Sequence, residues 1–217
     1  MSTTVPEVGQ ESAARTAGSL RLWIILSAGL ALAFLADGPV MNALKPFHDS
    51  GSSGFIRHTI RWLGIGYVQA FLLIVLVIVG GSRLPRVRSA GGWGLLALGI
   101  SGVMANILKV LVHRARPYVE LPHPDSWMSY VRDHRFQSFP SGESTTAFAV
   151  AVALGLWFPR ARAPLIMVAA VVALARVVVG DHAPSDVWAG AMLGTAVAQW
   201  VGSRAASREQ QGSEGAA

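Results

Sequence analysis

Three clusters of polar residues interrupt the apolar second half of the chain, within residues 109–117, 139–145 and 176–186. Lysine, arginine and the free amides at a helix N-terminus are groups with which proteins hold phosphate. The sequence therefore predicts a phosphate site. Its expected donors are Lys109, Arg116, Ser141, the Gly142 amide and Arg176.

The third cluster also contains a candidate nucleophile. His182 and Asp186 are four residues apart, across a turn that we expect Gly180 to open. A carboxylate that accepts a hydrogen bond from one imidazole nitrogen leaves the other nitrogen basic and correctly aimed. We expect His182 to attack phosphorus and Asp186 to orient it, although a turn with an incidental ion pair is the simpler alternative. Because the carboxylates are too few for a two-metal phosphoryl site, we expect no metal and no cofactor.

Each cluster is expected at the end of a helix. Lys109 and Arg116 are seven residues apart, which predicts one helix face, two turns apart, with Pro117 ending the helix. A lysine in an apolar run suggests function, and snorkelling to the membrane interface explains it equally well. Ser141 and Ser185 are expected to cap the helices that follow them, which an ordinary helix start would also require.

The composition predicts helices that lie in lipid. Hydrophobic residues make up 52% of the 217 residues and charged residues 14%, whereas soluble domains carry about 25% charged residues. This excludes a disordered chain, a coiled coil and a typical soluble enzyme. We predict an all-α polytopic membrane protein with six transmembrane helices in residues 19–203, between disordered tails at 1–18 and 204–217. The six apolar runs are Leu22–Ala36, Leu63–Gly80, Trp93–Val112, Thr145–Phe158, Pro164–Gly180 and Val187–Val201.

The net charge of +6 and the pI near 10.7 would ordinarily suggest nucleic acid as a partner. With six spans, however, the arginines of the short loops 81–92 and 159–163 and of both tails fall on one side. This bias predicts cytoplasmic termini in the plasma (inner) membrane, a site facing the periplasm or cell exterior, and no nucleic acid. A cleaved signal peptide over the first run is an alternative, since residues 31–33 mimic a cleavage site. The absence of cysteine excludes disulfides and thiol catalysis.

Two further features concern partners and substrate. Gly190 and Gly194 form a GxxxG pattern, which could support a homodimer and which also arises by chance in a glycine-rich membrane protein. The external segment Tyr118–Phe139 is expected to cover the site. Its Trp127, Met128 and Tyr130 are expected either to touch the acyl chains of a lipid or only to anchor at the interface.

The three clusters together resemble the type 2 phosphatidic acid phosphatase family, integral-membrane lipid phosphate phosphatases whose site is related to that of vanadium haloperoxidases. The motifs of that family are Lys-x6-Arg-Pro, Pro-Ser-Gly-His and Ser-Arg-x5-His-x3-Asp. The resemblance covers roughly residues 60–200. The matching segments here run from Lys109 to Pro117, from Pro140 to Glu143 and from Ala175 to Asp186.

The resemblance implies a phosphohistidine mechanism. His182 would attack phosphorus, Asp186 would orient it, and water would hydrolyse the intermediate. Lys109, Arg116, Ser141, Gly142 and Arg176 would hold the phosphate oxygens. The implied substrates are lipid phosphate monoesters or diphosphates, such as undecaprenyl diphosphate, phosphatidate, phosphatidylglycerol phosphate or lipid A phosphate. The alternatives are a lipid-phosphate binding protein without turnover and a transporter or channel, which the lack of polar residues in the central runs disfavours.

Two positions depart from the family pattern. Ala175 replaces a serine, which removes one hydroxyl donor. Glu143 replaces the second motif histidine, which would protonate the leaving alkoxide and contribute about 10²–10⁴-fold. Glu143 could act as that acid only with a raised pKa, or it could pair with Arg116 or Arg176 and occupy the phosphate site. Three interpretations stay open: an engineered change, a natural variant that uses His113 or His134 as the acid, and a natural non-hydrolysing relative.

Overall fold

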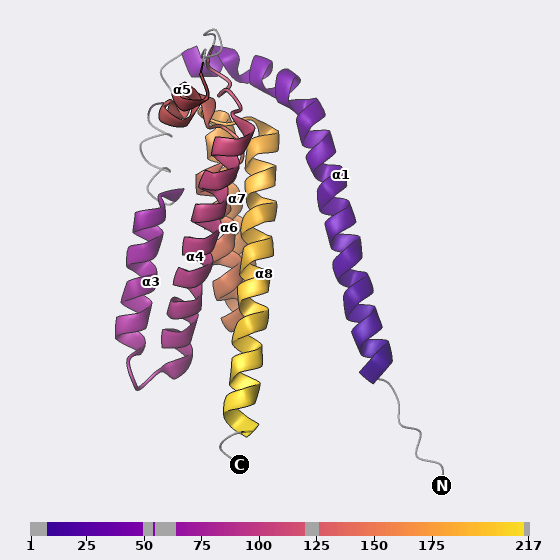
Figure 1. Ribbon diagram of the computed structural model, residues 1–217, viewed down its shortest axis with the longest axis vertical. Coiled ribbons are helices and arrows are strands. Elements are labelled where there is room, and N and C mark those ends of the chain that lie inside the picture. Colours follow the sequence, from indigo (N-terminus) through magenta and orange to yellow (C-terminus); the bar gives the residue numbers. More distant parts are fainter. Residues whose placement is uncertain (1–7, 50–53, 55–63, 120–125, 215–217) are drawn as a thin grey trace.

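The computed structural model describes residues 8–49, 54, 64–119 and 126–214, and every regular element among these residues is a helix, joined by turns and irregular segments. This confirms the predicted all-α class. The elements are α1 (Val8–Asp49), α3 (Gly66–Gly80), α4 (Pro85–Val112), α5 (Trp127–Arg132), η1 (His134–Phe136), α6 (Gly142–Trp157), η2 (Pro159–Ala161), α7 (Arg162–Val178) and α8 (Pro184–Glu214). The long helices run roughly side by side, with α1 along the outside of the bundle (Figure 1).

Helix α6 lies at the centre of the bundle and packs against α4, α7 and α8. Its approach to α8 is close because small residues line the contact. A methyl group on Gly190 would lie 2.6 Å from the carbonyl oxygen of Ser141, and one on Gly194 would collide with the carbonyl oxygen of Thr145. The GxxxG pattern therefore packs α8 against α6 within the chain. Because α6 already occupies this face, these glycines do not support the homodimer that the pattern could have indicated.

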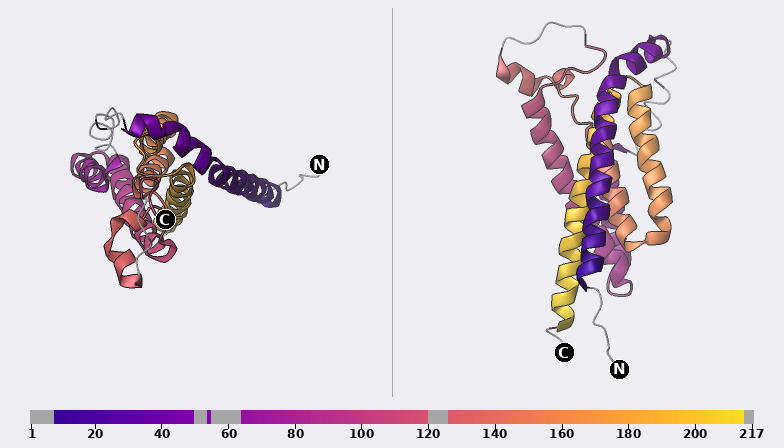
Figure 2. Two further views of the ribbon diagram at one scale, coloured as in Figure 1. Left: turned by 90° about the horizontal axis from the view of Figure 1, so that it is seen from above. Right: turned by 90° about the vertical axis from the view of Figure 1, so that its right-hand side faces the viewer.

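Helix α1 is longer than the predicted run Leu22–Ala36, and it continues through Pro39 and Pro46 to Asp49. Proline in a helix interior removes a backbone hydrogen bond and bends the helix, and α1 curves over one end of the bundle (Figures 1 and 2). The indole N–H of Trp188 on α8 donates to the carbonyl of Leu26 at 2.9 Å. The sequence predicts a loop after Ala36, whereas residues 37–49 continue the helix. Residues 50–53 and 55–63 of the predicted loop lie outside the described residues.

Helix α4 ends earlier than predicted. Its last residue is Val112, and His113 adopts a left-handed conformation (φ 52°) while its N–H donates to the Lys109 carbonyl. Lys109 therefore lies in the last turn of the helix, whereas Arg116 lies in the irregular segment beyond it. The prediction that Pro117 ends the helix, with both cations on one helix face, is wrong. The left-handed residue His113 ends the helix, four residues before Pro117.

The outer ends of α1 and α8 also exceed the predicted membrane domain. Helix α1 begins at Val8 and α8 continues to Glu214, so residues 8–18 and 204–214 are helical where tails are predicted. These segments contain alanine, glutamate, glutamine and arginine, which propagate a helix that is already nucleated. Residues 1–7 and 215–217 of the predicted tails lie outside the described residues.

By length and composition, three described helical segments are long and apolar enough to cross a membrane: Trp23–His48, Pro85–Val112 and Pro159–Val178. The apolar helix Gly66–Gly80 is shorter. Helix α6 has only 16 residues and contains several hydroxyl side chains. It is enclosed by its neighbours, so its length is not set by lipid contact alone.

Candidate functional site

The three polar clusters meet at one end of the bundle, where α4 ends and where α6 and α8 begin (the upper end in Figure 1). Ser141 caps α6 as predicted, and its Oγ accepts a hydrogen bond from the Ser144 N–H at 3.4 Å. The N–H of Ser141 donates to the carbonyl of Asp186 at 2.9 Å. This bond ties the second cluster directly to the third.

The imidazole of His182 and the carboxylate of Asp186 lie together in the interior. The Nδ1 atom of His182 lies 3.7 Å from Asp186 Oδ2, and the two side chains are 4% and 0% exposed. Ser138 bridges them, because its hydroxyl donates to Asp186 Oδ2 at 2.6 Å and lies 3.4 Å from Nδ1. With Nδ1 directed at these partners, Nε2 is the ring nitrogen left for attack. Catalytic hydrogen bonds are often longer without substrate and tighten when it binds.

A left-handed glycine positions the histidine. Helix α7 ends at Val178, and Gly180 follows with a φ of 79°, as the predicted turn requires. The N–H groups of Asp181 and His182 both donate to the Arg176 carbonyl, which closes the turn. A side chain at Gly180 would lie about 3.1 Å from the ring of His48 on α1. A larger residue at this position would therefore strain the left-handed turn that carries His182 and press against His48.

Burial lowers the pKa of His182 below its usual value, and this effect outweighs the opposing hydrogen bond from Asp186. The cations Arg116 and Arg176 lower it further. The imidazole is therefore neutral at pH 7, which is the state a nucleophile requires.

The buried guanidinium of Arg176 has two carboxylate partners. Its Nε atom lies 3.0 Å from Glu143 Oε2, and its Nη2 donates to Asp181 Oδ2. Pairing with Arg176 is one of the arrangements predicted for Glu143, and it is the one found. The carboxylate of Glu143 thus occupies a donor that is expected to bind a phosphate oxygen.

The other two predicted cations flank this pair. Lys109 Nζ would lie 3.1 Å from a methyl group placed on Gly142, so the ammonium group sits against the start of α6. Arg116 Nη1 is 3.4 Å from the carbonyl oxygen of Asp181, and its Nε donates to the His134 carbonyl. Lys109 also interacts electrostatically with Arg116, Arg176, Glu143 and Asp186. The structure therefore brings every predicted site residue into one region.

Three further polar residues belong to this region and were not identified from the sequence. Arg114 pairs with Asp186 at 2.7 Å and with Asp37 at 2.6 Å, and Ser138 bridges His182 to Asp186. Signals for two of them exist in the sequence. Arg114 lies between the motif residues Lys109 and Arg116, and Asp37 follows an apolar run, where a carboxylate suggests function. No sequence signal singles out Ser138.

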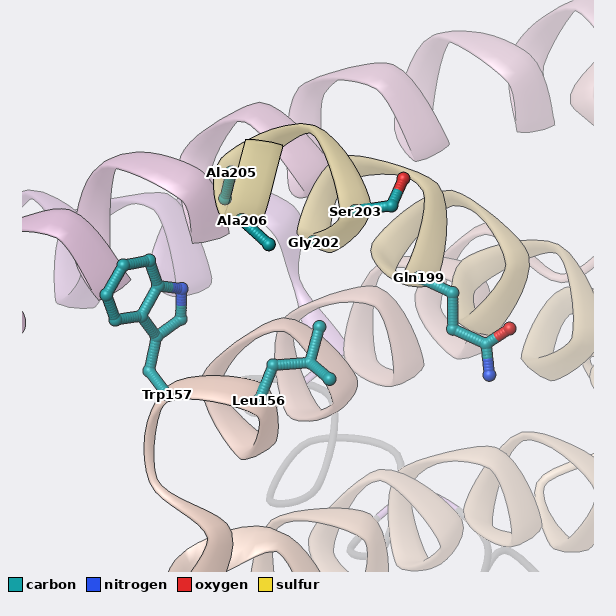
Figure 3. A pocket seen from close by; sticks show the side chains of 7 residues that line it. All are labelled: Leu156, Trp157, Gln199, Gly202, Ser203, Ala205 and Ala206. Carbon is teal, nitrogen blue, oxygen red and sulfur yellow. The ribbon is translucent and has the colours of Figure 1, made fainter. Parts of the chain in front are cut away.

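A groove of about 470 Å³ leads to Lys109 and Glu143 along α4 and α6. Gly66 and Gly99 line this groove, and a methyl group added to either glycine would have no atom within 4 Å. A second cavity, of about 350 Å³, lies far along α8, where Leu156 and Trp157 of α6 face the C-terminal half of that helix (Figure 3). None of its lining residues has a titratable side chain, so the chemistry belongs to the first region.

The segment expected to cover the site forms a short helix. Trp127 and Met128 of α5 are exposed, whereas the Tyr130 ring packs edge-on against His113 and Phe136. Tyr130 thus holds the segment together through contacts within the chain. Of the three residues expected to touch lipid, Trp127 and Met128 are exposed. Residues 120–125 lie outside the described part.

Comparison with known proteins identifies the family. Residues 91–207 match the PAP2 superfamily. A lipid A 1-phosphatase of Rhizobium johnstonii is 40% identical over 105 residues, which cover 48% of this chain and 43% of that protein. A decaprenylphosphoryl-5-phosphoribose phosphatase of Mycobacterium tuberculosis is 32% identical over 181 residues, which cover 81% of this chain and 87% of that protein.

The chain thus spans less than half the length of the lipid A 1-phosphatases that it matches. The fold is similar to that of the transmembrane PAP2 type phosphatidylglycerolphosphate phosphatase from Bacillus subtilis. That match has a TM-score of 0.57 and 24% identity, and it covers 84% of this chain and 92% of the other. The apolar helices and these relatives indicate a multi-pass membrane protein whose homologues are phosphatases of lipid phosphates. The chain belongs to the PAP2 superfamily.

Proposed function

We propose that the protein is a membrane lipid phosphate phosphatase that hydrolyses a phosphate monoester or diphosphate through a phosphohistidine intermediate. The observation that carries the proposal is the buried His182, which faces Asp186 on one side and lies among the cations Arg116 and Arg176. A neutral imidazole beside fixed cations suits attack on an anionic phosphoryl group.

In the proposed reaction, Nε2 of His182 forms a bond to phosphorus as the bond to the lipid oxygen breaks. Asp186 stabilises the positive charge that develops on the ring, and Lys109, Arg116 and Arg176 stabilise the phosphoryl oxygens with Ser141 and the Gly142 amide. The lipid alkoxide leaves with a proton, and water then attacks the phosphohistidine. This releases inorganic phosphate and restores the imidazole.

Glu143 stands where a proton donor to the leaving alkoxide is needed. In the ionised state that pairs with Arg176, it donates no proton and repels an anionic substrate. This pairing favours a second candidate function, a lipid-phosphate binding protein without turnover. For hydrolysis, substrate must displace Glu143 from Arg176, or a protonated Glu143 or His113 or His134 must supply the proton.

The groove along α4 supports a lipid as the substrate. Apolar and glycine residues of α4 line it together with Lys109, Gly142 and Glu143. A lipid that lies in the membrane could thus reach the phosphate site from the side of the bundle. The candidate headgroups are those of undecaprenyl diphosphate, phosphatidate, phosphatidylglycerol phosphate and lipid A. The last two appear in the names of a similar structure and of similar proteins.

We further propose six spans over residues 19–203, with both termini cytoplasmic and the site facing the periplasm or cell exterior at the plasma (inner) membrane. The basic residues support this orientation. Arg86 donates to the Trp157 carbonyl, and Arg204 and Arg208 lie over the Trp200 and Trp93 rings, at the end of the bundle opposite the site. Basic residues concentrate on the cytoplasmic side of membrane proteins.

Release of inorganic phosphate from the four candidate lipids tests the activity, with the unchanged chain and with Glu143→His in parallel. We expect release by the Glu143→His form at a rate that exceeds that of the unchanged chain by about 10²–10⁴-fold. If the folded Glu143→His form releases phosphate from none of these lipids, the phosphatase proposal fails. Lipid binding without release by both forms would favour the second function.

The nucleophile is tested by quenching the more active form in alkali and looking for labelled phosphate on the protein, since a phosphohistidine survives alkali and is lost in acid. We expect the label on a His182 peptide, and we expect none in His182→Ala. Labelling that persists in His182→Ala would assign the nucleophile to another residue.

A further inference from the structure

One guanidinium outside the matched motif positions joins carboxylates from distant parts of the chain. Arg114 Nη1 donates to Asp186 Oδ1 at 2.7 Å, and its Nη2 donates to Asp37 Oδ2 at 2.6 Å. Asp37 lies on α1 and Asp186 on α8. The side chains of Asp37 and Asp186 are 13% and 0% exposed, so water screens these ion pairs weakly.

Asp37 also holds the first turn of α8. The Ser185 N–H donates to Asp37 Oδ1 at 2.9 Å, and the Ser185 hydroxyl donates to Asp37 Oδ2 at 2.5 Å. The first amides of a helix lack partners within the helix, and here a side chain 148 residues away supplies one. The prediction that Ser185 caps α8 is wrong, because Ser185 lies inside the helix and is itself bound by α1.

The two oxygens of Asp186 have separate partners. Oδ1 accepts from Arg114, whereas Oδ2 accepts from Ser138 and from the Ala183 N–H at 2.9 Å and faces the imidazole of His182. This division fixes the rotation of the carboxylate. Without Arg114 a buried charge would lose its main cation, which is costly in the interior of a protein.

We infer that Asp37 and Arg114 are positioning residues for His182, which act by holding the carboxylate of Asp186. Through them, the docking of α1 on α8 becomes part of the working site. The kinetic consequence rests on the proposed function, whereas the effect on the imidazole can be measured without turnover.

The kinetic test uses the Arg114→Gln and Asp37→Asn variants of whichever form releases phosphate. We expect kcat to fall by about 10²-fold in Arg114→Gln, since small misplacements of a reacting group have this effect. KM should change little, because neither side chain is expected to touch the substrate. The two losses should not multiply in the double variant, since both act through one network. An effect on KM rather than on kcat, or losses in kcat that multiply in the double variant, would contradict the inference.

The matched control is Arg135→Gln, which breaks an exposed arginine–aspartate pair with Asp133 outside the network. We expect kcat of this variant to equal that of its parent. If Arg114→Gln behaves like Arg135→Gln, Arg114 has no positioning role.

The second readout is the pH dependence of His182 acylation by diethylpyrocarbonate, followed at the level of single peptides. Because only the neutral imidazole reacts, the midpoint of this curve reports the charge state of the ring. Among the residues that the structure describes, the charged and titratable groups of this region, besides Arg114 and Asp37, are Asp186, Arg176, Asp181, Arg116, Lys109, Glu143 and His48.

We expect Arg114→Gln to move the His182 midpoint to higher pH, since Asp186 keeps its Ser138 and Ala183 donors and stabilises the imidazolium without a competing cation. Arg114→Lys should restore the midpoint and leave kcat low, because one ammonium group cannot hold both carboxylates in the same geometry. An unchanged midpoint in Arg114→Gln would overturn the inference. Faster acylation of all histidines, His134 included, would also overturn it, since it would indicate general loosening.

Absence of phosphate release from every form would refute the proposed function alone. The acylation curve would then still decide whether Arg114 and Asp37 control His182.

Discussion

At the scale of single residues, the carboxylate of Glu143 is the feature that most affects the site. It lies 3.0 Å from Arg176 Nε, in the same buried region as Lys109 and His182. A carboxylate among cations lowers the local positive potential where a phosphate must bind. The family motif has a histidine at this position, which would leave that potential intact.

We therefore expect Glu143→Gln to bind inorganic vanadate, a mimic of the phosphoryl group, at least about tenfold more tightly, which corresponds to about 1.4 kcal/mol. Titration calorimetry on the purified protein measures this affinity. Asp133→Asn is the matched control, because it removes a partly buried carboxylate that pairs with Arg135 rather than with Arg176. Equal affinities for both variants would show that Glu143 does not compete with the anion.

The pH dependence follows from the lowered pKa of His182. The reactive form is the neutral imidazole, so activity should persist as the pH falls to 6.5, the usual histidine pKa, and be lost only below it, as the ring takes up a proton. The acidic limb of the pH profile of kcat/KM, where activity is lost as the pH falls, measures this protonation in an active form. In Asp186→Asn the raising effect of the carboxylate is gone, so the limb should move to still lower pH. A limb above pH 6.5 would contradict the assignment of the base.

At the scale of elements, the contact between α6 and α8 carries the site, because Ser141 begins one helix and Asp186 lies in the first turn of the other. The glycines of α8 allow this approach. A methyl group at Gly194 would meet the backbone of Thr145 and Ala149, which cannot move aside as a flexible side chain can.

Gly194→Ala should accordingly reduce the free energy of unfolding by about 1–3 kcal/mol, the usual cost of overpacking. Gly92→Ala on α4 is the matched control, since no atom lies within 4 Å of its added methyl group, and alanine should stabilise that helix by up to about 1 kcal/mol. Thermal unfolding in detergent, followed by tryptophan fluorescence, compares the two. A Gly194→Ala variant as stable as its parent would contradict this packing.

At the scale of the whole molecule, the ends of the bundle differ in chemistry. One end gathers the three polar clusters under the bend of α1, whereas the other holds the α3–α4 turn and the C-terminal end of α8 (Figures 1 and 2). The proposed orientation places the first end outside the cell and the second end in the cytoplasm.

The absence of native cysteine makes this orientation directly testable. Ser126→Cys places a thiol on an exposed residue before α5, and Ser82→Cys places one in the α3–α4 turn. We expect a membrane-impermeant maleimide to label Ser126→Cys in intact cells and Ser82→Cys only after the membrane is opened. The reverse pattern would invert the topology, and labelling of both variants in intact cells would refute six spans.

The sequence by itself determined the helical class, the apolar runs and the set of residues suited to phosphate chemistry, because these depend on composition and on spacing along one segment. The Gly180 turn and the Ser141 cap were predictable for the same reason, since each is a local property of the backbone. The ends of the helices were less predictable, since α4 stops at His113 rather than at Pro117 and α1 continues through Pro39.

Only the tertiary structure decided which partners the charged groups take. Arg114 reaches Asp37 and Asp186 across 77 and 72 residues, and Glu143 finds Arg176 rather than Arg116. Likewise, Gly190 and Gly194 face α6 of the same chain rather than a second copy. Such pairings depend on how helices pack in three dimensions. Spacing along the sequence records which face of one helix a residue occupies and carries no information on which neighbour covers that face.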